Sequence, residues 1–317
     1  MKKQTTIRFV VHRKRINFGS AELRVVQLVR ILEQQLGSRV RIEIEKLPRR
    51  RGLGQELWAL KQKPGDVIVF AKISLPELRS RVLDILRYRG ALTCLDYVDS
   101  DLRLVTKRRA DVHIAASESA LRKMRDLISQ AEASGAPVSG QPFLLHHNTD
   151  ARLAGLKVRP SDSLNTIYFG DIRNTIISDS IAKRISVLNI DRADQIEDAS
   201  KTLADYNLHY CVRRMVEEEP GDIVAKPFTK GFIAAQMGAP VLINKDVDDA
   251  VELLGNDYPF LIADTSETAI LDGLDLAEDA YGGPAWQEAL SRMAQMRQVF
   301  SHEAIARQFG DILDYLA

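Results

Sequence analysis

The chain has 317 residues, a net charge of +1 and 45% hydrophobic residues, which is typical of a globular protein with room for two domains. No stretch approaches the roughly 18 continuous apolar residues of a membrane span, and the N-terminus lacks the apolar region of a signal peptide. The two cysteines, Cys94 and Cys211, lie far apart and match no metal or redox spacing. These features predict a cytoplasmic protein.

The small net charge hides a strong asymmetry between the two halves of the chain. Residues 1–155 hold 29 Lys and Arg against 16 Asp and Glu, a net charge of +13, whereas residues 156–317 have a net charge of −12. Such a split indicates two domains with different partners. The basic half favours a negatively charged partner, which could be nucleic acid, an anionic membrane surface or an acidic acceptor.

The first half alternates apolar strands with amphipathic helices. Strands are expected over residues 6–12, 40–44, 66–70, 91–96, 112–116 and 143–145, and helices lie between them. Nearly continuous apolar strands that alternate with helices predict a parallel sheet covered on both faces. Ligands bind such sheets at the carboxyl ends of the strands, so the basic loops 13–20 and 46–54 and the acidic loop 97–101 are candidate functional loops.

A polar linker at 156–164 precedes a second alternation of strands and helices. Strands are expected at 165–169, 208–212, 241–243 and 260–262, and residues 266–317 are expected to be helical with a break near Gly282–Pro284. We therefore predict two Rossmann-like α/β domains, at 1–155 and 156–285. The helical tail at 286–317 is expected to pack back on the first domain.

One stretch of the second half carries an unusual charge pattern. A short helix is predicted to begin at Pro227 and end at Gly238. Lys226 and Lys230 would share its first turn, where like charges four apart cost about 0.2–0.5 kcal/mol and acids are normally favoured. An anion bound by the free N–H groups, the Thr229 hydroxyl and both lysines would offset this cost. A solvated turn with two harmless lysines is the alternative, and both interpretations stay open here.

Further basic residues follow two neighbouring strand ends. Arg173 comes after one predicted strand and Arg213 ends another, so both should reach the same edge of a parallel sheet as the helix start. A cationic edge on an acidic domain predicts a diphosphate site. There is no G-x-G-x-x-G after a strand and no P-loop motif. His146 and His147 would point to opposite sides of an extended chain, so the pair is not predicted to bind a metal. Asp96, Asp99 and Asp101 could form a metal or general-base cluster, or simply a solvated acidic loop.

Five short motifs occur in order along the chain: Asn17–Arg24, Leu95–Asp99, Ala110–Glu118, Tyr168–Gly170, and Lys226–Lys230 followed by Gly238–Val241. In residues and order they resemble the acceptor-side loop, the D-x-x-D stretch, the fifth strand, the donor-domain opening and the donor-binding helix of GT-B glycosyltransferases of the capsule or O-antigen type. The resemblance implies two Rossmann-like domains facing each other across a cleft. It also implies sugar transfer from a nucleotide-sugar to a glycan or lipid-linked acceptor in surface polysaccharide synthesis.

The resemblance assigns roles to particular residues. The donor diphosphate is expected at Gly170, Arg173, Arg213, Lys226, Thr229 and Lys230. Cations there would stabilise the leaving diphosphate, so neither a metal nor a cofactor is expected. The acceptor side is expected at Asn17, Gly19 and Ser20, and a base for an inverting reaction at His12, Asp96 or Asp99. Lys226 and Ile233 stand about where retaining relatives carry an E-x7-E pair, and the pattern is absent, so a retaining outcome is not implied.

Two other functions stay open at this point. One is a nucleic-acid-binding protein that uses the basic half, although aromatic residues make up only 6% of the chain and no recognition motif occurs. The other is a GT-B-like protein that isomerises a nucleotide-sugar or has lost catalysis. For the leading interpretation, the basic first half also predicts peripheral attraction to the anionic inner face of the cytoplasmic membrane.

Overall fold

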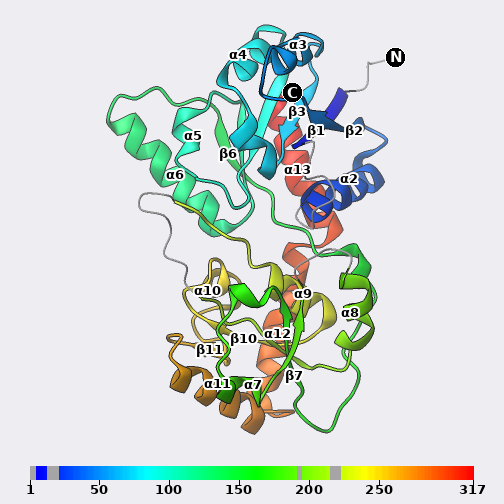
Figure 1. Cartoon of the computed structure of the whole chain (residues 1–317), viewed down its shortest axis with the longest axis vertical. Helices are drawn as coiled ribbons and strands as arrows, with labels where there is room; N and C mark the ends of the chain where they lie inside the picture. The colour runs from blue at the N-terminus through cyan, green and yellow to red at the C-terminus, as the bar shows by residue number, and fades with distance from the viewer. Residues whose placement is uncertain (1–4, 13–20, 191–194, 215–222) are drawn as a thin grey trace. The chain divides into compact units, whose positions relative to one another are not determined.

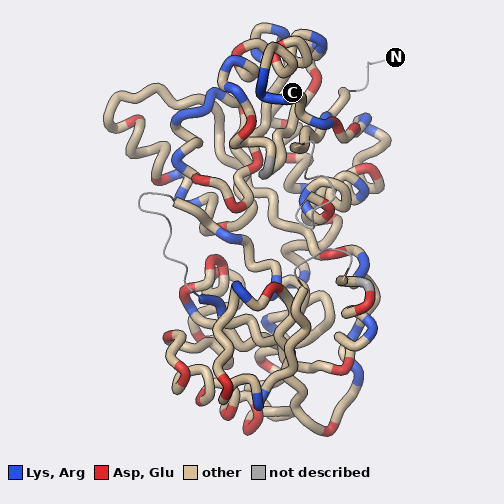
Figure 2. The backbone as a smooth tube through the Cα atoms, viewed as in Figure 1, with Lys and Arg blue, Asp and Glu red and all other residues tan. Residues whose placement is uncertain are grey.

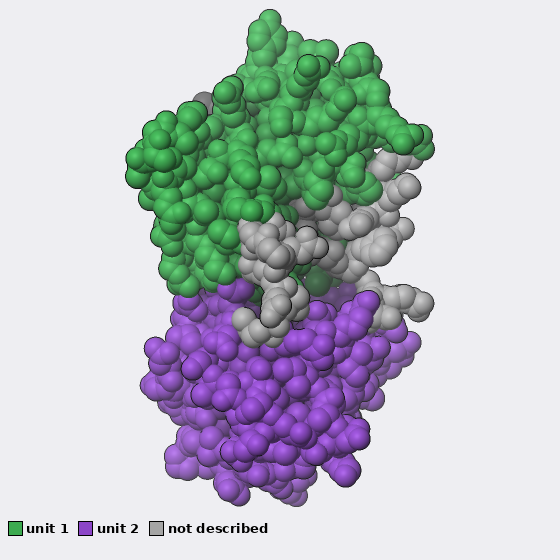
Figure 3. Space-filling view, turned by 60° about the vertical axis from the view of Figure 1, so that its left-hand side comes forward, with its two compact units in different colours: residues 1–148, 218–227, 302–317 green, residues 149–217, 228–301 purple. Residues whose placement is uncertain are grey.

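The computed structural model describes residues 5–12, 21–190, 195–214 and 223–317, and it divides the chain into two compact units (Figures 1 and 3). Unit 1 comprises residues 1–148, 218–227 and 302–317, and unit 2 comprises 149–217 and 228–301. The predicted first boundary lay after residue 155, and the predicted tail began at 286. In the structure, unit 2 extends to residue 301, and of the predicted tail only residues 302–317 belong to unit 1.

Unit 1 is built on a parallel sheet that, in the described residues, has six strands in the order β2-β1-β3-β4-β5-β6 (Figure 1). The strand order reverses at β1, so the topological switch point lies between β1 and β3. The strands are β1 Thr5–His12, β2 Val40–Leu47, β3 Val67–Phe70, β4 Leu92–Asp96, β5 Val112–Ala115 and β6 Gln141–Leu144.

Helices cover both faces of this sheet, and the core between them is apolar. Phe9 of β1 stacks on Phe309 of the C-terminal helix at 5.8 Å between ring centroids, and Phe70 of β3 is fully buried. The helices are η1 Glu22–Gln27 (a π-helix), α2 Leu28–Leu36, α3 Gly54–Leu60, η2 Lys72–Glu77, α4 Ser80–Tyr88, α5 Leu104–Lys107, α6 Glu118–Ala133 and α13 His302–Leu316. The last of these, α13, packs against α2.

Unit 2 repeats the same topology with a parallel sheet of five described strands in the order β11-β10-β9-β7-β8. Its switch point therefore lies between β7 and β9. The strands are β7 Thr166–Gly170, β8 Ser186–Asn189, β9 Leu208–Tyr210, β10 Val241–Asn244 and β11 Leu261–Ile262. The helices are η3 Ala151–Leu153, η4 Ile172–Asn174, α7 Asp179–Ala182, α8 Gln195–Leu203, α9 Thr229–Met237, α10 Ala250–Leu254, α11 Glu267–Asp279 and α12 Pro284–Val299.

A short docked segment, residues 223–227, lies between β9 and α9 in the chain but belongs to unit 1. The Leu102 N–H donates to the carbonyl of Ile223 at 2.8 Å, and Lys123 Nζ donates to the carbonyl of Val224 at 3.2 Å. Ala225 is buried in the hydrophobic core of unit 1. The chain thus leaves unit 2 after β9, contributes to unit 1, and returns to begin α9.

The two units carry opposite net charges, as the charge asymmetry of the sequence predicts. Unit 1 holds 30 Lys and Arg against 21 Asp and Glu, a net charge of +9, and unit 2 has a net charge of −8 (Figure 2). The two parallel sheets with flanking helices confirm the prediction of two Rossmann-like α/β domains. None of the helices in the described residues combines the length and the apolar character needed to cross a bilayer.

Candidate functional site

The switch point of unit 2 brings three strand ends to one edge of the sheet. β7 ends at Gly170 beside β9, which ends at Tyr210 and continues into Arg213, and β10 ends next to them at Asn244. The helix α9 packs on β9 and begins at this edge. Ligands of open parallel sheets bind at such switch points, so this edge is the candidate site.

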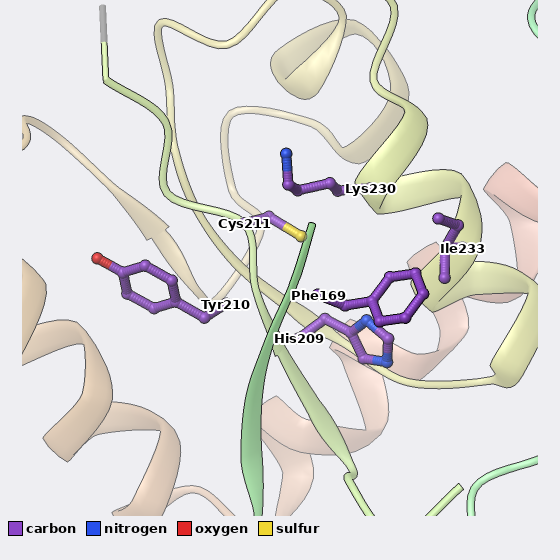
Figure 4. A pocket seen from close by; sticks show the side chains of 6 residues that line it. All are labelled: Phe169, His209, Tyr210, Cys211, Lys230 and Ile233. Carbon is purple, nitrogen blue, oxygen red and sulfur yellow. The ribbon is translucent and has the colours of Figure 1, made fainter. Parts of the chain in front are cut away.

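The Lys230 side chain crosses the end of β7. A Cβ atom placed on Gly170 would lie 2.9 Å from Lys230 Cε, so a side chain at this position would displace the end of the lysine. Gly170 also has a φ of +147°, which side chains disfavour. The Lys230 ammonium lies 5.4 Å from the centroid of the Tyr168 ring. Figure 4 shows Lys230 extending from α9 above Cys211.

Arg173 lies at the same edge, but a carboxylate that sequence reasoning did not single out already holds it. Arg173 Nε donates to Asp171 Oδ1 at 3.0 Å, and Arg173 Nη2 donates to Asp171 Oδ2 at 2.6 Å. The hydrogen bond from Arg173 holds the pKa of Asp171 below its ordinary value. The Arg173 side chain is 79% exposed. An anion that binds here must therefore compete with Asp171 for the Arg173 guanidinium.

Arg213 is positioned by Asn244, a second residue that sequence reasoning missed. The backbone N–H of Arg213 donates to Asn244 Oδ1 at 2.9 Å. Asn244 is fully buried, and its Nδ2 has no hydrogen-bond partner in the described part of the chain. An asparagine closing an otherwise apolar strand was the available signal, because buried amides are normally hydrogen-bonded. Burial raises the pKa of the Tyr168 hydroxyl, and the nearby charge of Arg213 opposes that rise.

The start of α9 is held by an aromatic ring. Phe228 is the N-cap residue and offers no side-chain hydrogen bond to the first turn. Its buried ring lies against Gly231, where an added Cβ would come within 2.2 Å of Phe228 Cζ. The N–H groups in the first turn of an α-helix point out of the helix end, and the helix dipole favours an anion beside them.

The prediction that the helix begins at Pro227 is wrong. The helix begins at Thr229 rather than at Pro227, because residues 226 and 227 belong to the segment docked on unit 1. Lys226 and Lys230 therefore do not share a helix face. Unit 2 brings together Gly170, Arg173, Arg213, Thr229 and Lys230 at one sheet edge, whereas Lys226 is assigned to unit 1.

The residues predicted for the acceptor side and the base belong to unit 1. His12 is the last residue of β1, which borders the switch point of that sheet. Asp99 is exposed in the loop after β4 and has a φ of +49°, which is uncommon for a residue other than glycine. Asn17, Gly19 and Ser20 lie outside the described residues.

Asp96, at the end of β4, is engaged in a buried ion pair. Arg24 Nε donates to Asp96 Oδ2 at 2.9 Å, and Arg24 Nη2 lies 3.4 Å from Asp96 Oδ1. Arg24 also donates to the carbonyls of His146 at 2.7 Å and Leu145 at 2.8 Å. The two side chains are 1% and 4% exposed. This arrangement gives Asp96 a structural partner and ties η1 to β4 and to the chain after β6.

Within the described residues, no group of three or more His, Cys, Asp or Glu is arranged to hold a metal ion. The paired histidines are engaged separately. His146 Nδ1 lies 2.9 Å from Gln308 Nε2, and His147 Nδ1 lies 2.9 Å from the Asn148 carbonyl.

A buried histidine of unit 2 should make this unit acid-sensitive. His209 lies beneath Lys230 with Phe169, Cys211 and Ile233 (Figure 4), and burial lowers its pKa to about 4. An unfolded histidine titrates near 6.5, so between these values the unfolded state binds more protons and stability falls as the pH drops. We expect a loss of about 3 kcal/mol between pH 7 and pH 4 from this residue.

Urea unfolding at several pH values measures this loss. The His209→Gln variant, which does not titrate, should lose that part of the pH dependence. An unchanged pH dependence in the variant would contradict the assignment to His209. Because burial also lowers the pKa of His146 to about 4, the signal should be followed with a probe in unit 2.

No protein-family model matches the sequence, and the comparison with curated proteins found no match. Solved structures, in contrast, match over nearly the whole chain. A glycosyltransferase from Rickettsia africae superposes with a TM-score of 0.64 at 10% identity, covering 99% of both chains. Sucrose-phosphate synthase from Thermosynechococcus elongatus gives a TM-score of 0.60 at 14% identity, again covering 99% of both chains.

HepE from Anabaena, solved in complex with UDP, gives a TM-score of 0.59 at 13% identity and covers 98% of this chain and 100% of its own. At these identities the likeness concerns the fold. With its two Rossmann-like units, the chain has the fold of the GT-B glycosyltransferases.

Proposed function

We propose that the protein is a glycosyltransferase that moves a sugar from a nucleotide-sugar to a glycan or lipid-linked acceptor. The observation that carries the proposal is the placement of Lys230. Its side chain runs from the first turn of α9 across Gly170, at the switch point where Arg173 and Arg213 also lie. The likeness to HepE, which has been solved with UDP and with UDP-glucose, supports a nucleotide-sugar as the ligand.

The chemistry follows from the charges at this edge. When the bond between the sugar carbon and the diphosphate oxygen breaks, negative charge builds up on the leaving diphosphate. Lys230, the first-turn N–H groups of α9 and the Thr229 hydroxyl would stabilise that charge, and Arg213 and Arg173 would bind the outer oxygens. Asn244 Nδ2 offers a further N–H donor beside Arg213. With these groups in place, we propose that transfer proceeds without a metal or cofactor.

The acceptor is assigned to unit 1, near residues 13–20 and the switch point at the end of β1. Its hydroxyl would attack the sugar carbon and lose a proton. His12 and Asp99 remain the candidates for the base, because Asp96 already accepts from the Arg24 guanidinium. A role in surface polysaccharide synthesis would place the enzyme at the inner face of the cytoplasmic membrane.

A thermal-shift panel of nucleoside diphosphates tests the donor site. A ligand at 100 times its Kd should add about 2.7 kcal/mol of stability, and we expect UDP to be among the nucleotides that respond. Activity measured as release of the nucleoside diphosphate should be unchanged by EDTA. The absence of a response to every nucleotide would overturn the proposal. Consumption of donor without an acceptor would instead indicate isomerisation or hydrolysis.

A further inference from the structure

Helix α3 of unit 1 exposes leucines along its outer side. Leu53, Leu57 and Leu60 are 65%, 56% and 47% exposed, and they account for three of the large hydrophobic residues that the described structure leaves open to water. Their spacing places them in one stripe along the helix. Exposing such a stripe to water is unfavourable unless something covers it.

The inner side of the same helix is mixed, because Ala59 and Trp58 pack on the hydrophobic core of unit 1 and two polar residues are buried beside them. Gln55 is fully buried, and its Nε2 donates to the carbonyls of Pro48 at 3.1 Å and Glu77 at 3.0 Å. Buried Glu56 accepts from Arg79 Nη1 at 2.6 Å. Because these buried polar side chains form hydrogen bonds to particular partners, the helix cannot rotate about its axis to bury the leucines without breaking those bonds.

Basic residues flank this leucine stripe in the sequence. Between residues 46 and 63 the only acid is Glu56, which is buried and paired with Arg79. Arg79 also donates to the Gly52 carbonyl at 2.8 Å, which holds the loop before the helix. Figure 2 shows basic positions gathered around α3 and α4. The exposed cations of the segment are Lys46, Arg49, Arg50, Arg51, Lys61 and Lys63.

We infer that the α3 surface, defined by Leu53, Leu57, Leu60 and these six cations, docks on an anionic lipid bilayer. The leucines would enter the interface while the Lys and Arg side chains meet lipid phosphates. Charge complementarity selects this occupant. A two-fold contact with a second copy would set the same patch against itself and bring its exposed cations together, which costs rather than gains free energy.

The α3 surface belongs to unit 1, whereas the proposed donor site belongs to unit 2. If the proposed function also holds, docking through unit 1 favours a lipid-linked acceptor over a free glycan. The vesicle experiment below contains no nucleotide, so its outcome does not depend on donor binding.

Co-sedimentation of the full chain with vesicles tests the docking. We compare phosphatidylcholine alone with phosphatidylcholine containing about 30% phosphatidylglycerol, a membrane of negative surface potential. Wild-type protein should partition onto the anionic vesicles and lose most of that binding at high salt. The variant Leu53→Gln/Leu57→Gln/Leu60→Gln should partition about tenfold less. The variant Arg49→Gln/Arg50→Gln/Arg51→Gln should partition about a hundredfold less.

A matched control comes from unit 2. Leu276 is 52% exposed on α11 in the acidic unit, and Leu276→Gln should leave partitioning unchanged. Circular dichroism and unfolding midpoints check that each variant is folded. Equal binding of wild type to both kinds of vesicle, or binding that survives the leucine changes, would overturn the inference. Two other results would also overturn it. One is a dimer, detected by light scattering, that dissociates in the leucine variant; the other is oligonucleotide binding that is lost only in the arginine variant.

Discussion

Replacing Lys230 by alanine should lower the turnover number about 100- to 1000-fold, the usual cost of losing one group that stabilises charge in the transition state. The ammonium lies at the first turn of α9 beside the end of β7, where the proposal places the leaving diphosphate. The thermal stabilisation by UDP should shrink at the same time. Steady-state kinetics and thermal shift on the same preparation measure both effects.

Two further variants make this test specific. Lys157 lies outside α9 and donates to the Gln236 carbonyl at 3.1 Å, at the opposite end of that helix, so Lys157→Ala removes a lysine that contacts the same helix and should leave turnover unchanged. Gly170→Ala keeps Lys230 but places a methyl group 2.9 Å from its Cε, and it should reproduce much of the loss by displacing the ammonium. If the Lys230→Ala variant kept wild-type turnover, the proposed binding of the diphosphate at α9 would be wrong.

Replacing Asp96 by asparagine should destabilise unit 1 by about 3–5 kcal/mol. The change leaves the buried Arg24 guanidinium without its counter-charge, and uncompensated buried charges are among the most costly single changes. Urea unfolding followed by a probe in unit 1 measures the effect, because a protein with two units need not unfold in one step.

Asp99 provides the matched control for this prediction. It is exposed in the loop that follows β4, and asparagine tolerates its positive φ, so Asp99→Asn should change stability by less than about 0.5 kcal/mol. If Asp99 acts as the base, this variant is folded and slow. An Asp96→Asn variant that is as stable as wild type but inactive would instead make Asp96 the base.

The sequence was sufficient to predict the two parallel sheets. Runs such as Val67–Phe70 are apolar throughout, which is what strands covered on both faces require, and the structure confirms them. The edge strand β8 was missed. Its residues, Ser186–Asn189, are mostly exposed, so the pairing with β7 rather than any local pattern makes them a strand.

The candidate site was predictable in part. The positions of Arg173 and Arg213 after strands placed them correctly at one sheet edge, because parallel strands end together. The partners of the charged residues were not predictable. Asp96 and Arg24 lie 72 positions apart in the sequence, and the approach of Lys230 to Gly170 depends on how α9 packs. Such pairs arise from tertiary contacts that leave no periodic signal.

The docked segment 223–227 also constrains how this protein could be recombined. A chimaera that takes residues 149–301 from a relative would replace the docked segment too, and with it Ala225 in the core of the other unit. Exchanging unit 2 cleanly requires two inserts, 149–217 and 228–301, with residues 218–227 kept from the original chain. In this protein the boundaries of a transferable module are therefore set by contacts rather than by a single linker.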